Sequence, residues 1–201
     1  MKDIKDALRE VIHTRRSTRN YRSDPVPEEL LAEIVEAGRM APSGNNNQNT
    51  HFIVVKNPEK LAELRSVLTG ALSNMPVQAW MPPPMVGLIE KAKSGPVAVD
   101  YNAPVLVFTA NKKGYTNAIA DCSCTLENMM LMASACGIGS CWINIYHLLR
   151  EASPIRGYME KIGLCEDEEV YGALALGYTD HLDTVPLPRK GNSVTDRKSV
   201  V

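Results

Sequence analysis

The 201-residue sequence has no apolar run that approaches the roughly 18 residues of a membrane-spanning helix. Its first six residues include four charged side chains, where a secretion signal would begin to build its apolar segment. The net charge is only −1, so there is no global positive field to attract nucleic acid. These absences predict a cytoplasmic protein without a membrane or nucleic-acid partner.

The common nucleotide-binding motifs are also missing. There is no Gly-x-Gly-x-x-Gly after a strand and no Gly-x-x-x-x-Gly-Lys-Ser/Thr, so dinucleotide and P-loop sites have no support. Gly137-Ile138-Gly139 follows a helical pattern and leads into a strand, which is the reverse of a Rossmann turn. We expect these glycines to end the helix and to let backbone amides lie close to a flat ligand.

Metal-binding spacings are absent as well. The five cysteines include no Cys-x-x-Cys pair, and on a helix Cys122 and Cys124 would point about 200° apart. The four histidines are scattered and form no ligand pair or Ser/His/Asp set. We therefore expect reduced thiols and no metal, and we interpret 166–169, a run of four acids, as a solvated entrance to a strand.

Apolar and charged fractions of 44% and 22% suit one globular domain over 1–201, and no linker interrupts it. Hydrophobic periodicity predicts helices and strands that alternate along the chain. The expected helices cover 4–12, 27–38, 58–68, 117–136 and 155–162, and the expected strands cover 51–56, 103–110, 140–145 and 169–177. This order favours an α/β sandwich with mixed strand directions.

Two segments break the periodic pattern. Residues 74–99 combine tryptophan and methionines with prolines that oppose a regular helix, so we expect an irregular insertion that acts as a lid, the alternative being a disordered loop. Residues 178–201 form a tail without periodicity. Such a tail frays unless something holds it, and a partner subunit is our candidate.

Two polar loops carry the candidate chemistry. Residues 13–22, which we call the basic loop, follow the first helix and contain no acid, and their last eight positions hold four arginines and the hydroxyls of Ser17 and Thr18. Arginine forks and a serine hydroxyl suit a phosphate dianion, so we interpret the loop as an anion clamp; a solvated basic turn is the alternative. Residues 41–50, the amide loop, are more polar than a turn requires.

Four stretches in order resemble the FMN-dependent nitroreductase family. They are Arg15-Arg16-Ser17-Thr18-Arg19, Ala41-Pro42-Ser43-Gly44-x-Asn46-x-Gln48-x-x-His51-Phe52, Gly137-Ile138-Gly139-Ser140-Cys141-Trp142-Ile143, and the 172–177 strand followed by Arg189-Lys190. The resemblance implies an α+β fold, a three-layer α/β/α sandwich with a mixed central sheet. It also implies an intertwined homodimer, with the 178–201 tail wrapping the partner.

The resemblance further implies where FMN binds. The phosphate and pyrimidine side would be held by Arg15, Arg16, Ser17 and Arg19, with Arg189 and Lys190 joining at the phosphate. Pro42, Ser43, Gly44 and Asn46 would come from the other subunit, and Gly139, Ser140, Ile143 and Asn144 would lie along the flavin. In this interpretation no side chain acts as a catalytic acid, and Arg15 or Arg19 would stabilise the reduced flavin and raise its reduction potential. The Asn49-Thr50 pair departs from the family's frequent Pro-Trp, which leaves the substrate preference open.

The implied activity is hydride transfer from NADH or NADPH to flavin N5, followed by reduction of a nitroaromatic, quinone or related acceptor in a ping-pong mechanism. One alternative is a specialised flavin enzyme of the same fold, such as a reductive dehalogenase that uses Glu90, Lys91 and Lys93 to bind a zwitterion. A second alternative is a protein that stores or senses FMN without turnover.

Overall fold

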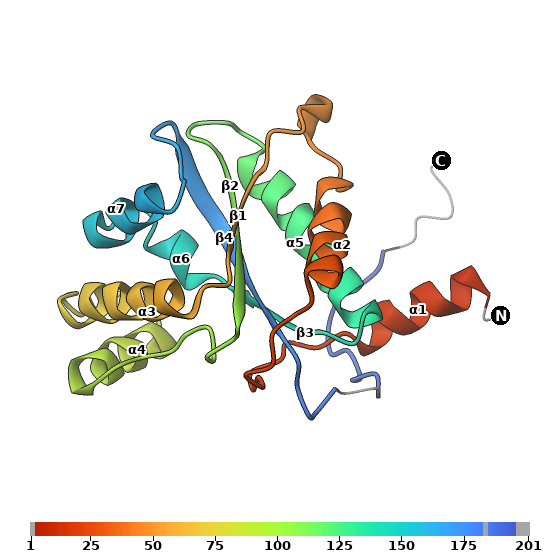
Figure 1. Cartoon of the computed structure of the whole chain (residues 1–201), viewed down its shortest axis with the longest axis horizontal. Helices are drawn as coiled ribbons and strands as arrows, with labels where there is room; N and C mark the ends of the chain where they lie inside the picture. Colours follow the sequence, from red (N-terminus) through yellow and green to blue (C-terminus); the bar gives the residue numbers. More distant parts are fainter. Residues whose placement is uncertain (1–2, 183–184, 196–201) are drawn as a thin grey trace.

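The computed structural model describes residues 3–182 and 185–195. Its sheet contains β1 (His51–Val55), β2 (Val105–Lys112), β3 (Gly139–Ile143) and β4 (Glu168–Gly177), in the order β1-β2-β4-β3 (Figure 1). All three pairings are antiparallel. β2 and β3 run in the same direction because each pairs antiparallel with β4, which lies between them. The four strands therefore pair in the antiparallel sense, and among the described residues the parallel contact expected of a mixed sheet is limited to the isolated bridge between Ser17 and Ser140 at the edge of β3.

Helices cover both faces of the sheet, which Figure 1 shows nearly edge-on. One face packs against α3 (Pro58–Ser73), α4 (Pro83–Ser94), α6 (Ile145–Leu148) and α7 (Ser153–Lys161), and the other against α2 (Glu28–Arg39) and α5 (Ala118–Ala135). Alternation along β2 divides the core, because Leu106 and Phe108 face the first layer while Val105 and Val107 face the second. The predicted three-layer α+β sandwich is confirmed.

Helix α4 corrects the expectation that 74–99 is irregular. Prolines 82, 83 and 84 do not disrupt it, because Pro82 precedes the helix and the other two lie in its first turn. An N–H is not needed there, since the first turn has no intrahelical acceptor for it. Ile89 and Ala92 are buried in the core beside α3. The stretches before and after α4, 74–82 and 95–99, lack regular structure, and Trp80 in the first of them is 77% exposed.

A buried ion pair sets the chain's approach to β2. Arg65 on α3 donates its Nε–H to both carboxylate oxygens of the fully buried Asp100, at 3.1 and 2.9 Å. Its Nη2 also donates to the carbonyl of Ala103. The next two residues, Tyr101 and Asn102, both have positive φ angles, 56° and 58°. The pair therefore stabilises a turn that L-residues rarely adopt.

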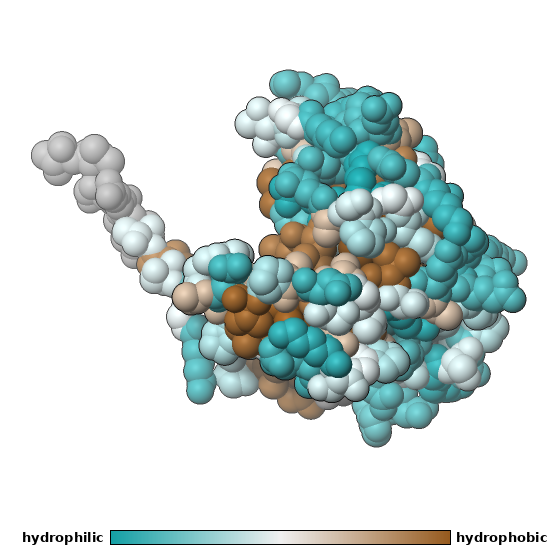
Figure 2. Space-filling view, turned by 90° about the vertical axis from the view of Figure 1, so that its left-hand side faces the viewer, coloured by the Kyte–Doolittle hydropathy of each residue, from teal (hydrophilic) through white to brown (hydrophobic). Residues whose placement is uncertain are grey.

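Two parts of the chain lie apart from the core. The first helix, α1 (Ile4–Thr14), has no buried residue, and its apolar Ile4, Leu8 and Ile12 are exposed. Figure 1 shows α1 extending from the body. Residues 185–195 are all exposed, and Figure 2 shows the stretch next to the grey end of the chain standing out from the body. No helix in the described ranges has both the length and the hydropathy to cross a bilayer.

We predict that Asp100→Ala lowers the free energy of unfolding by about 3 kcal/mol, because it leaves the half-buried Arg65 guanidinium without its counter-charge. Urea denaturation followed by circular dichroism measures the change. Asp24→Ala is the matched control, since Asp24 pairs with Arg22 at an exposed position. We expect the control to lose less than about 1 kcal/mol. Equal losses in the two variants would show that the buried pair has no special structural role.

Candidate functional site

The basic loop and the start of β3 form a cavity of about 240 Å³, which we call the basic cavity. The loop is held by the backbone of β3, because the Thr18 N–H donates to the Ser140 carbonyl at 2.8 Å and Ser17 forms a parallel bridge with Ser140. Six predicted site residues line this cavity: Arg15, Arg16, Ser17, Arg19, Gly139 and Ser140. The structure therefore brings together two stretches that are more than a hundred positions apart.

The arginines of the loop have different partners. Arg16 donates to three backbone carbonyls, those of His13, Arg15 and Val185, and its buried Nε has no partner within the described residues. Arg15 approaches only Glu127, at 3.9 Å, among the described acids. Arg16 therefore organises the loop, while most donors of Arg15 remain available for an anion.

Arg19 lies beside an aromatic ring. Its guanidinium carbon is 6.0 Å from the ring centre of Tyr101, and its Nη1 donates to the Ser17 carbonyl at 3.3 Å. A hydrogen bond with Tyr101 raises the pKa of Arg19 further above its usual value, so the side chain stays charged. Behind the loop, burial raises the pKa of the Cys141 thiol, although Arg19 and Arg15 oppose this shift. The arginines therefore give this site a positive charge.

A second, larger cavity of about 1120 Å³ lies between α4, the 95–101 segment and the end of β3. Ile143 and Asn144, both predicted to lie along the flavin, line this cavity beside Trp142. Tyr101 also lines the large cavity, and its ring lies beside Arg19 of the basic cavity, so this residue connects the two cavities. Strand β3 consequently runs from the basic cavity to the large cavity.

The amide loop lies elsewhere. Its short 3-10 helix η1 (Gly44–Asn46) is at the opposite end of α5 from the basic cavity (Figure 1). The Gly44 N–H donates to Asp121 near the start of α5, whereas Ser134 near its end lines the basic cavity. Thirteen helical residues correspond to about 20 Å. Of the predicted residues here, Pro42 and Ser43 line a small third cavity, and none reaches the basic loop within this chain.

The C-terminal basic pair does not reach the basic cavity either. Arg189 and Lys190 are exposed, and neither makes a hydrogen bond or ion pair with the residues that the structure describes. The tail instead contacts the loop through Val185, whose carbonyl accepts from Arg16 at 2.7 Å. The last six residues of the predicted tail lie outside the described ranges.

Sequence reasoning missed Tyr101. Its position depends on the positive-φ turn that the Arg65–Asp100 pair stabilises. No local pattern indicates that turn, because the two charged partners are 35 positions apart. Tyr101 adds an aromatic ring beside Arg19, where the sequence analysis had indicated only arginines and backbone amides.

Comparisons with known proteins agree with this architecture. The family model described as "Nitroreductase family" matches residues 12–178. A crystal structure of a nitroreductase with bound FMN from Bacteroides fragilis is 34% identical and superimposes with a TM-score of 0.78, over 96% of this chain and 98% of that one. This chain belongs to the nitroreductase family.

Two archaeal relatives carry the name "Putative NADH dehydrogenase/NAD(P)H nitroreductase". The protein from Methanothermobacter thermautotrophicus is 30% identical over 84% of this chain and 75% of its own length. The protein from Archaeoglobus fulgidus is 29% identical over 84% of this chain and 83% of its own length.

We predict that Gly139→Ala destabilises the fold by about 1–3 kcal/mol, because the added Cβ would lie 2.8 Å from Thr18 Cγ2 and Oγ1 and would push the basic loop off β3. Thermal and urea unfolding measure the loss. Gly157→Ala is the control, since its Cβ would meet nothing within 4 Å on α7. The control should be neutral or gain up to about 1 kcal/mol from helix propensity. If both variants unfold alike, the loop does not pack on β3 as described.

Proposed function

We propose that this protein is an FMN-dependent oxidoreductase that uses NADH or NADPH to reduce a nitroaromatic, quinone or related acceptor. The observation that carries the proposal is the basic cavity, in which Arg15 and Arg19 keep guanidinium donors beside the Ser17 hydroxyl. The buried, unpartnered Nε of Arg16 is a further donor in the same loop. This set of cations without an acid in the lining fits a phosphate dianion.

The residues that would hold FMN follow β3. Arg15, Ser17 and Arg19 would bind the phosphate, and the backbone near Ile143 and Asn144 would lie along the ring system. Charge-assisted hydrogen bonds contribute roughly 1.5–3 kcal/mol each. Three of them account for much of the roughly 8 kcal/mol of a micromolar complex. FMN would supply the hydride and electron transfer, which this chain's side chains do not provide.

The large cavity would receive both the nicotinamide and the acceptor. Its volume of about 1120 Å³ accommodates a drug-sized molecule, and Tyr101 and Trp142 supply aromatic surface for a flat one. Because one cavity would serve both substrates, the first product must leave before the acceptor enters, which gives ping-pong kinetics. Helix α4 forms one wall of the cavity, and the 74–99 segment would act as its lid through α4 and the exposed Trp80.

A second candidate function rests on charges in the same cavity. Glu90 and Lys91 of α4 both line it. An acid and a base side by side can bind the ammonium and carboxylate of a zwitterion, as a reductive dehalogenase of amino-acid-like substrates would require. Faster turnover of a halogenated amino acid than of a quinone would favour this alternative.

We also propose a homodimer in which each FMN site uses both subunits. The amide loop lies about 20 Å from the basic loop in one chain. Pro42, Ser43, Gly44 and Asn46 can therefore approach the flavin only from a partner. The exposed apolar stripe of α1 and the extended tail with Arg189 and Lys190 offer surface for that partner.

We predict that replacing both Arg15 and Ser17 by alanine releases FMN while the fold remains intact. Removal of two charge-assisted contacts should weaken FMN binding at least 100-fold, by the contact energies given above. Fluorescence titration with FMN measures the affinity, and circular dichroism checks the fold. Lys161→Ala is the control, because Lys161 of α7 pairs with Glu63 at an exposed position and lines none of the three cavities. A double variant that purifies fully loaded with FMN would refute the clamp.

We predict that Leu8→Glu dissociates the dimer, because it places a charge in the apolar stripe of α1. Light scattering after size-exclusion chromatography measures the mass, and Lys5→Ala on the same helix is the control. Deletion of 188–201 should also loosen the dimer and lower FMN occupancy. If both altered proteins stay dimeric and loaded with FMN, neither α1 nor the tail forms the interface.

A further inference from the structure

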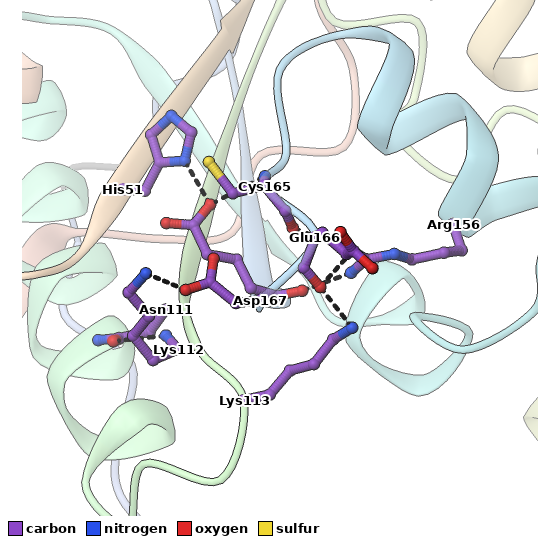
Figure 3. Close-up of polar contacts among 9 residues, drawn as sticks. His51, Asn111, Lys112, Lys113, Arg156, Cys165, Glu166 and Asp167 are labelled. Carbon is purple, nitrogen blue, oxygen red and sulfur yellow. Dashed lines mark hydrogen bonds and ion pairs between the residues drawn. The ribbon is translucent and has the colours of Figure 1, made fainter.

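Three ligand-type side chains meet outside the cavities described above. They are His51, the first residue of β1, Glu168, the first residue of β4, and Cys165 in the loop before β4. Their ligand atoms all lie within 4.8 Å of one another. Figure 3 shows the Cys165 sulfur lying close to the His51 ring. We call this group the His-Cys-Glu cluster.

The sheet order explains why these residues meet. His51 pairs with Ala110 of β2, and Glu168 pairs with Lys112 from the other side of the same strand. Both side chains therefore lie at one end of the sheet, on either side of β2. Glu168 is buried, which corrects the expectation that the whole 166–169 run is solvated. Its Oε2 lies 2.8 Å from His51 Nδ1 and accepts from the Cys165 N–H at 3.1 Å.

The loop that carries Cys165 is held in place from several directions. Arg156 of α7 donates to the carbonyls of Cys165 and Glu166, at 2.9 and 3.0 Å, and also to that of Glu168. The Lys113 N–H donates to the Asp167 carbonyl at 2.9 Å. Figure 3 shows the Arg156 and Lys113 side chains converging on Glu166, whose carbonyl accepts from both. A loop with this many backbone contacts presents its thiol in a fixed position.

We propose that the His-Cys-Glu cluster binds one Zn²⁺ ion, with water as a fourth ligand. Imidazole nitrogen, thiolate sulfur and carboxylate oxygen are the three ligand types of protein zinc sites. Zinc–ligand distances of about 2.0–2.3 Å place tetrahedral ligands roughly 3.5 Å apart. Binding would separate His51 Nδ1 from Glu168 Oε2, which are 2.8 Å apart, and would bring together the more distant ligand atoms, which lie within 4.8 Å. The half-exposed His51 and the exposed Cys165 permit these small movements. Mg²⁺ and Ca²⁺ prefer oxygen ligands and do not suit this set.

Zinc at this position would join β1 to the loop before β4 at the end of the sheet. His51 directly follows the amide loop, so the ion would also fix the point where that loop enters β1. The site is separate from the basic cavity and from the large cavity, because none of its three residues lines either one. It would therefore act on stability and on the position of the amide loop, and it would affect the proposed flavin site only through that loop.

The most direct test measures how fast iodoacetamide alkylates each cysteine of the intact wild-type protein, with and without a small excess of Zn²⁺. Peptide mass spectrometry follows the sites separately in one sample. We expect Zn²⁺ to slow alkylation of Cys165 at least tenfold. Cys124 is the internal control, because it is also exposed but belongs to no cluster. Mg²⁺ in place of Zn²⁺ should leave both rates unchanged.

Calorimetric titration with Zn²⁺ tests the ligand set. We expect Cys165→Ser, Glu168→Gln and His51→Gln each to weaken binding tenfold or more, whereas Cys124→Ser and His13→Gln should bind like the wild type. Unchanged alkylation of Cys165 in the wild type with Zn²⁺ would overturn the proposal, whatever the variants do. Protection that persists in Glu168→Gln and His51→Gln would also overturn it, since zinc would then bind the thiol without the cluster.

Discussion

The contact between the basic loop and Ser140 is the constraint on which the candidate site depends. β3 is an edge strand of the described sheet, and its outer edge pairs with Ser17 and Thr18 rather than remaining open. The backbone of β3 thus fixes the middle of the loop, and this contact positions the arginines on either side of it. Gly139 permits this approach because a Cβ at that position would collide with Thr18. The edge of the sheet and the basic cavity therefore depend on the same backbone contact.

Strand β3 also connects the basic cavity to the large cavity. Its first residues line the basic cavity and its last residues line the large cavity, with Tyr101 contacting both regions. A phosphorylated cofactor bound along β3 would have its anionic end among arginines and its ring in the roomier part. The amide loop is about 20 Å away along α5. For that reason the chain alone holds half of the site that its family resemblance implies.

Much of this arrangement could be predicted from local patterns. Apolar periodicity located the main helices and all four described strands, and the run of arginines indicated the loop that lines the basic cavity. The rest depends on tertiary contacts. Prolines opposed a helix at 74–99, yet α4 forms because they lie before it and in its first turn. The position of Tyr101 depends on a buried ion pair whose two residues are 35 positions apart in the sequence. The His-Cys-Glu cluster depends on residues that only the order of the strands brings together.

The central claim is that this protein binds FMN and oxidises a reduced nicotinamide. The most direct measurement is the absorption spectrum of the purified protein, recorded before and after anaerobic addition of NADH and then of NADPH. Our account predicts flavin bands that bleach with at least one donor, and the effective donor identifies the preference. Flavin bands that resist both donors would contradict the proposed reductase and favour FMN storage or sensing. A colourless protein that also fails to bind added FMN would contradict the whole account.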